Sequence, residues 1–134
     1  MTSIKCYFDV IGHDFDPAVL TAALGIEPTE TWCTGERTRR SGRPYKHDGW
    51  SLRSEEVVSL DLQEVVTPIL NRVLPVASVL VEVCGRLNLG VELACAVYVE
   101  DDQIPAISLD SETVRMLSAL GASLDIDILN LGAS

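Results

Sequence analysis

Residues 91–99 read VELACAVYV, and their alternation decides the fold class. Every second residue is apolar, while Glu92 and Tyr98 lie among the residues between them. Because successive side chains of a strand point to opposite faces, the stretch predicts a strand with one buried and one wet face. Strands of this kind favour an α+β fold, with a mainly antiparallel sheet and helices packed on one side of it.

The same alternation recurs in three other stretches. Residues 3–11, 49–54 and 122–129 each read as a half-buried strand, and a further strand is expected at about residues 30–34. In the last strand, Leu124, Ile126 and Ile128 are expected to face inward. The opposite, wet face of the sheet should carry these residues: Tyr7, Asp9, Ser51, Arg53, Tyr98, Asp125 and Asp127.

Three helices are predicted between these strands. Asp16-Pro17 begins a short helix that ends at Gly25, and Asp110 begins another that ends near Leu120, with Val114 facing inward. Asp61 and Glu64 make a capping-box-like helix start. From there apolar residues at helical spacing run to residue 87, interrupted by Pro68 and Pro75. A kink is expected at Pro75, or two consecutive helices with Pro75 near the start of the second.

The predicted order is therefore strand–helix–strand–strand–helix–strand–helix–strand, and its first six elements follow the ferredoxin-like order. With 134 residues, the whole chain (1–134) is expected to form one domain. The N-terminus has no apolar signal stretch, and residues 60–89 carry too many polar side chains for a membrane span. We expect a soluble, cytoplasmic protein without a membrane partner.

Charge is distributed unevenly along the chain. The net charge is −10, yet six of the ten Lys and Arg residues lie in residues 37–53 beside a single acid, Asp48. Nucleic acid is therefore an unexpected partner for the acidic body of the protein, and a basic protein partner is favoured. A homo-oligomer that covers the wet face of the sheet is also compatible with the sequence.

The basic segment, residues 34–50, should be a long hairpin loop, and long loops often carry function. Its arginines suit anion binding, and its aromatic residues could stack on a base. Alternatively, the arginines pair with acidic side chains of the sheet and only offset the acidic body. The candidate binding residues are Arg37, Arg39, Arg40, Arg43, Tyr45, Trp50, Arg53, Asp9, Asp125 and Asp127.

Catalytic and metal sites are poorly supported by the sequence. The four cysteines have no zinc-site spacing and read as small buried residues. Asp14 and Asp16 lack the further ligands of a calcium loop, and a Cys33–His47 nucleophile pair has no support in its spacing. With Asp9 or Glu92 on neighbouring strands, Asp125 and Asp127 could form an acid–base pair, although no positioned nucleophile is visible. We expect no cofactor, no metal and no enzymatic activity.

Several segments together resemble a known family. They are residues 8–17 (FDVIGHDFDP), 24–29 (LGIEPT), 35–36 (GE), 50–52 (WSL) and 121–127 (GASLDID). In these segments the chain is similar to the bacterial family called domain of unknown function 4279. The resemblance implies neither an established activity nor catalytic residues. It does suggest a toxin-neutralising, immunity-type binding role.

Two functional hypotheses follow. The first is a non-enzymatic protein-binding module whose partner is a basic protein such as a toxin. The second is a small-molecule or anion-binding domain that uses the 34–50 loop and the polar face of the sheet.

Overall fold

The computed structural model describes residues 1–38 and 41–132 as one sheet covered by helices on one face. In chain order the elements are β1 (Ser3–Gly12), α1 (Pro17–Leu24), β2 (Glu30–Trp32), β3 (Asp48–Arg53), β4 (Val57–Val58), α2 (Leu62–Val73), the 3-10 turn η1 (Leu74–Val76), α3 (Ala77–Leu87), β5 (Gly90–Val99), α4 (Ser111–Ala119) and β6 (Ala122–Asn130).

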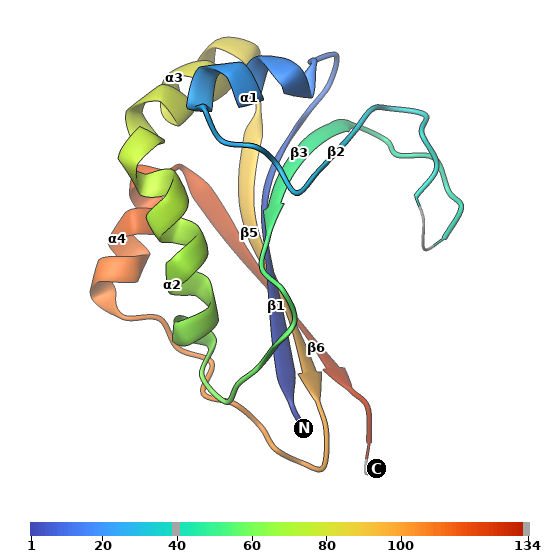
Figure 1. The fold of residues 1–134 in the computed structure, drawn as a ribbon, viewed down its shortest axis with the longest axis vertical. Coiled ribbons are helices and arrows are strands. Elements are labelled where there is room, and N and C mark those ends of the chain that lie inside the picture. The colour runs from blue at the N-terminus through green and yellow to red at the C-terminus, as the bar shows by residue number, and fades with distance from the viewer. Residues whose placement is uncertain (39–40, 133–134) are drawn as a thin grey trace.

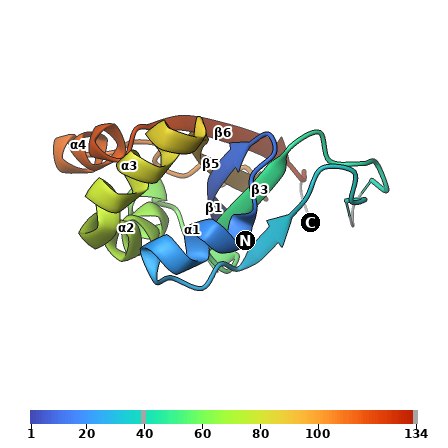
Figure 2. The same ribbon diagram turned by 90° about the horizontal axis from the view of Figure 1, so that it is seen from above.

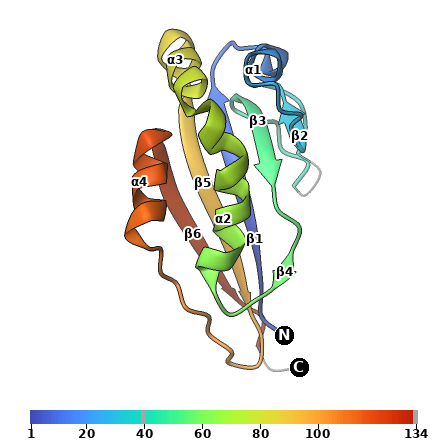
Figure 3. The same ribbon diagram turned by 60° about the vertical axis from the view of Figure 1, so that its left-hand side comes forward.

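The sheet has the strand order β2–β3–β1–β5–β6, with β4 paired to the start of β1. All pairs are antiparallel except β5–β6, which is parallel. The first four strands of this path, read as β5–β1–β3–β2, are the antiparallel arrangement of the ferredoxin-like βαββαβ unit. Helix α4 and strand β6 add a crossover at the β5 edge (Figure 3). The predicted α+β class and ferredoxin-like start are confirmed.

The helices all lie on one side of the sheet, and the segment between β2 and β3 projects on the other side (Figures 1 and 2). The core between sheet and helices contains fully buried residues from both layers, including Phe8, Trp50, Leu70 and Leu93. The segment 62–87 is long and apolar enough to cross a membrane. This holds by length and composition only, and the apolar face of the segment packs into the core against the sheet.

The helix boundaries follow the sequence signals closely. The carboxylates of Asp16, Asp61 and Asp110 each accept a backbone N–H in the first turn of a helix, at 3.0, 3.1 and 2.8 Å. At Pro75 the helix gives way to one 3-10 turn, after which α3 begins, so the predicted break is confirmed. Pro68 is exposed, and α2 continues through it.

The burial of the C-terminal part was predicted wrongly. Leu124 and Ile128 lie on the helix-covered side of β6 but are 43% and 58% exposed, and Val114 of α4 is 53% exposed. The reason is position: β6 is the last strand of the sheet, and a groove separates it from α4 and residues 107–109. Strand β4 was not predicted, since two residues are too short for an alternation signal.

Both ends of the described chain lie at the same end of the sheet (Figure 1). The amino group of Met1 donates to the Glu100 carboxylate at 2.6 Å. The N–H of Asp101 donates to the carbonyl of Gly132 at 3.1 Å. The start of β1 and the end of β6 therefore meet where β5 ends, and the 34–50 loop leaves the sheet elsewhere.

Candidate functional site

The open face of the sheet gathers acidic side chains from three neighbouring strands. Asp9 of β1 lies directly opposite Glu92 of β5, and Glu92 lies opposite Ser123 of β6. Asp125 and Asp127 follow on the same face of β6, where both are exposed. The structure thus brings together three of the predicted residues, Asp9, Asp125 and Asp127. The structure adds Glu92 to this group. Sequence reasoning considered Glu92 only as a possible partner of Asp125 and Asp127 and did not name it as a candidate binding residue.

These carboxylates repel one another. Burial raises the pKa of the Glu92 carboxyl above its ordinary value, and the negative charges of Asp125, Asp9 and Asp127 raise it further. Burial also raises the pKa of Asp9, against a hydrogen bond from the Ser51 hydroxyl at 2.5 Å. Like charges directly opposite on adjacent strands are destabilising. A cation brought to this face would relieve that repulsion.

Arg53 is held in place at the other side of the same face. Its guanidinium forms an ion pair with Glu30, and its Nε donates to the Ser51 hydroxyl at 3.1 Å. The same group lies over the rings of Tyr7 and Trp32, 5.2 and 5.9 Å from their centroids. Arg53 therefore organises the surface and is only partly available to an external anion.

A cleft of about 690 Å³ opens on this face, between the sheet and the 34–50 loop. All three tyrosines of the chain line it: Tyr7, Tyr45 and Tyr98. Charged side chains of both signs complete the walls, namely Lys5, Glu30, Arg53 and Glu56. Tyrosine and arginine are the residue types that recognition surfaces use most, because they combine large apolar area with hydrogen-bonding groups.

The described residues of the loop, 34–38 and 41–47, extend the β2–β3 hairpin. Gly35 donates its N–H to the carbonyl of Tyr45 at 3.0 Å, and Tyr45 donates to Glu36 at 2.8 Å. The Arg37 guanidinium donates to the carbonyl of Gly42 at 2.8 Å, which keeps it within the loop. Arg43 is exposed. Two further candidates, Arg39 and Arg40, lie outside the described residues.

The hypothesis that loop arginines pair with acids of the sheet finds no support within residues 1–38 and 41–132. The ion pairs there are Met1–Glu100, Arg53–Glu30 and Arg86–Glu82. The strand order explains this, because the loop leaves from β2 and β3 while Asp125 and Asp127 lie on β6 at the opposite edge. Among the described residues, the loop arginines therefore form no ion pair with the acidic face.

Asp48, the first residue of β3, anchors the start of the loop, a structural role that sequence reasoning missed. Its buried carboxylate accepts the N–H and the hydroxyl of Thr34, at 2.7 and 3.0 Å, and the N–H of Phe15 at 3.0 Å. These bonds, the one from the Thr34 backbone first, hold the pKa of Asp48 below its ordinary value. A signal was present in the sequence: a single acid within a basic segment, directly before Gly49 and Trp50.

The aromatic prediction needs a correction. Trp50 is fully buried on the helix side, where its indole N–H donates to Thr21 at 3.0 Å, so it cannot stack on a ligand. Tyr45 instead stacks on Trp32, with ring centroids 5.1 Å apart. The Trp32 indole N–H also donates to His47 at 3.3 Å. Sequence periodicity placed Trp50 on a buried face correctly, and its proximity to the loop was misleading.

The cysteines are buried as predicted, except Cys33, which is exposed. Burial raises the pKa of the Cys84 thiol to about 11. The pKa of the Cys33 thiol is also raised, by desolvation and by the negative charge of Glu36, the direction opposite to that of an activated nucleophile. Among the residues that the structure describes, no three His, Cys, Asp or Glu side chains are grouped so as to hold a metal ion.

Comparison with known proteins gives one result. No curated protein and no solved structure matches the chain. A family model described as domain of unknown function (DUF4279) matches residues 2–131. Since this match spans nearly the whole chain, from the start of β1 to the end of β6, the protein belongs to the DUF4279 family.

Proposed function

We propose that the protein is a non-enzymatic binding module for a basic protein, and that the acidic open face of the sheet is its contact surface. The observation that carries the proposal is the group of four carboxylates, Asp9, Glu92, Asp125 and Asp127, with the pKa values of Asp9 and Glu92 raised. A basic partner would neutralise this group. Charge complementarity of this kind speeds association and selects partners.

A toxin that the protein neutralises in the bacterial cytoplasm is the partner class that the proposal favours. Small size, a net charge of −10 and a polar surface rich in tyrosine are compatible with such a role. The uneven charge also supports it, because the acidic body would attract a cationic toxin over several ångströms at low ionic strength.

The proposal is tested by affinity purification with a charge-matched control. The chain and its Asp125→Asn/Asp127→Asn variant would be used to capture proteins from the native host. The control, Glu82→Gln/Glu112→Gln, removes two charges from exposed helix positions instead. We expect a stoichiometric basic protein to be retained by the chain and the control and lost from the Asp variant. Equal retention by all three, or an acidic partner, would contradict the proposal.

A second candidate function is supported by the tyrosine-lined cleft. Its volume of about 690 Å³ falls in the range of small-molecule sites, and Lys5 and Arg53 place positive charge in it. An aromatic ligand with an anionic group would match these walls. The function would then be small-molecule or anion binding.

This candidate is tested by thermal unfolding with nucleotides, phosphorylated metabolites and carboxylates. A ligand at about 100 times its dissociation constant stabilises the folded state by ~2.7 kcal/mol. Tyr98→Ala should abolish the shift, because Tyr98 lines the cleft and is not part of the core. If no compound raises the unfolding midpoint, or if Tyr98→Ala leaves the shift intact, the cleft is not the binding site.

A further inference from the structure

Strand β6 leaves one edge of the sheet open. It pairs with β5 on one side, and within residues 1–38 and 41–132 no segment pairs with its other side. Leu131 donates its N–H to the carbonyl of Val99 at 2.8 Å. Because the hydrogen-bonding direction alternates along a strand, the even-numbered residues Leu124, Ile126 and Ile128 turn their N–H and C=O groups toward the open edge. Unpaired edges of this length invite another strand.

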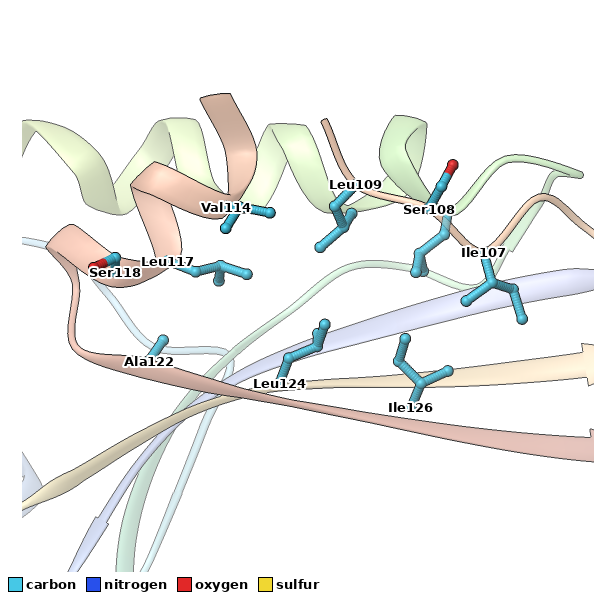
Figure 4. A pocket seen from close by; sticks show the side chains of 10 residues that line it. Ile107, Ser108, Leu109, Val114, Leu117, Ser118, Ala122, Leu124 and Ile126 are labelled. Carbon is cyan, nitrogen blue, oxygen red and sulfur yellow. The ribbon is translucent and has the colours of Figure 1, made fainter. Parts of the chain in front are cut away.

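An apolar groove runs along this edge on the helix side. It has a volume of about 560 Å³ and lies between β6, α4 and residues 107–109. Figure 4 shows Leu124 and Ile126 projecting from β6 into the groove, Leu124 on the side of α4 and Ile126 on the side of Ile107. Further along the strand, Ile128 is 58% exposed. The apolar side chains that β6 was predicted to bury are thus accessible to a partner.

The other face of the same edge is acidic. Asp125 and Asp127 alternate with the apolar residues and are exposed on the open face, next to Glu92 of β5. The edge therefore offers apolar contacts on one side, negative charge on the other, and free backbone groups between them. Its complement is an extended segment that alternates apolar and basic side chains.

A second copy of the chain fits this edge less well. Antiparallel pairing about Ile126, the middle of β6, would place Asp125 directly opposite the second copy's Asp127. Pairing about Asp125 or Asp127 would place that carboxylate opposite itself. Like charges directly opposite are destabilising, and acidic residues on an edge are a known guard against self-pairing. The charges therefore favour a cationic partner strand over a second copy.

We propose that the open edge of β6 binds an extended cationic segment of a partner protein by strand addition. The partner's backbone pairs with Leu124, Ile126 and Ile128, its apolar side chains enter the groove beside α4, and its Lys or Arg side chains lie over Asp125 and Asp127. This inference rests on the proposed function, because it names the segment of the basic partner that is recognised. It adds a mode of recognition in which main-chain bonds supply affinity and alternate side chains supply specificity.

The first test uses synthetic peptides on the intact protein. A short peptide that alternates Val and Arg should bind saturably in isothermal titration calorimetry, and one that alternates Val and Glu should not. Methylation of alternate backbone nitrogens, on the edge that would pair, should abolish binding while leaving the side chains unchanged. If the methylated peptide binds as well as its parent, strand addition is wrong.

The second test uses variants of β6. Ile128→Pro removes an edge N–H without removing a bond to β5, whereas Ile128→Ala shortens the same side chain and keeps the N–H. We expect the proline variant not to bind the Val–Arg peptide. The alanine variant should bind this peptide with most of the original affinity. Asp125→Asn/Asp127→Asn should weaken binding about tenfold, as expected for the loss of two opposite-charge cross-strand pairs. Thermal unfolding of each variant checks that the fold is kept.

The outcomes separate this inference from the proposed function. If a captured basic protein still binds Ile128→Pro but not the Asp variant, the acidic face is confirmed as a binding surface and strand addition is refuted. If sedimentation shows a dimer that Ile128→Pro dissociates, the occupant of the edge is a second copy and the inference is overturned. If Ile128→Pro binds neither the peptide nor the captured protein while Ile128→Ala binds both, the inference is supported.

Discussion

Asp48 is the residue on which the placement of the loop depends. Its carboxylate joins the start of the loop, through Thr34, to the turn before α1, through Phe15. A neutral side chain of the same shape cannot accept all of these bonds with the strength of an ionised carboxylate. One buried acid therefore fixes how the basic loop leaves the sheet.

The first prediction concerns the replacement Asp48→Asn. Because the folded state lowers the pKa of Asp48, the group stabilises the fold above its ordinary pKa, and this stabilisation is lost as the pH falls through the lowered value. At pH 7 we expect a fall in the unfolding midpoint on the order of 5 °C, and little difference from the original chain at pH 2. Thermal unfolding followed by circular dichroism measures both. Glu55→Gln, an exposed charge removal, is the control; an equal loss there would refute the role of Asp48.

The second prediction concerns Glu92→Gln and has the opposite sign. The folded state raises the pKa of Glu92, first by burial, so ionisation of this group costs stability as the pH rises above its ordinary value. The variant should be more stable at pH 7 by about 0.5 kcal/mol, the scale of a like-charge cross-strand pair, and unchanged at pH 3. Urea unfolding of the variant and the original chain at both pH values measures this difference in stability. A destabilised variant at pH 7 would mean that the carboxylate makes a favourable contact.

At the scale of elements, strands β2 and β3 meet at an unusually close contact. A Cβ atom on Gly49 would overlap the indole ring of Trp32, which stacks on Tyr45 at the base of the loop. This explains why a glycine stands directly before the buried Trp50. The loop, the stacked rings and the β2–β3 pair are therefore coupled at one backbone position.

The third prediction is that Gly49→Ala destabilises the fold by about 1–3 kcal/mol, the usual cost of overpacking. The cost should largely disappear when Trp32→Ala is also present, since the ring that clashes is then gone. Urea unfolding of the two single variants and the double variant gives the interaction energy. Gly85→Ala is the control, because a Cβ at that position of α3 meets no neighbour within 4 Å. Additive costs of the two replacements would contradict the proposed clash.

Local sequence signals predict the helices and strands themselves. They do not predict how exposed each element is. Caps at Asp16, Asp61 and Asp110 and the break at Pro75 are properties of a few neighbouring residues, so the sequence predicts them. The exposure of β6 is a property of strand order, since the same alternation describes an internal strand and an edge strand. The hydrogen bonds that Asp48 accepts join residues far apart along the chain. The periodicity of apolar residues in the sequence therefore does not predict them.

At the scale of the whole molecule, the candidate surface was predicted in part. The polar face and its acids follow from alternation on each strand, and the register then places Asp9 beside Glu92. The expected pairing of loop arginines with these acids was not found among the described residues, because the sheet order separates them. Overall charge predicts the sign of a partner, while the cleft and the open edge require the three-dimensional arrangement.

The first and last described residues, Met1 and Gly132, lie near each other, and this has a mechanical consequence. A force that pulls the ends apart acts across the strands rather than along them, so the hydrogen bonds between β5 and β6 would be loaded one after another from that end. A sheet loaded in this way unfolds by sequential rupture of its hydrogen bonds at low force, and β6 detaches from β5 first. The strand with the accessible edge is thus also the one that traction on the chain would release before the ferredoxin-like core is strained.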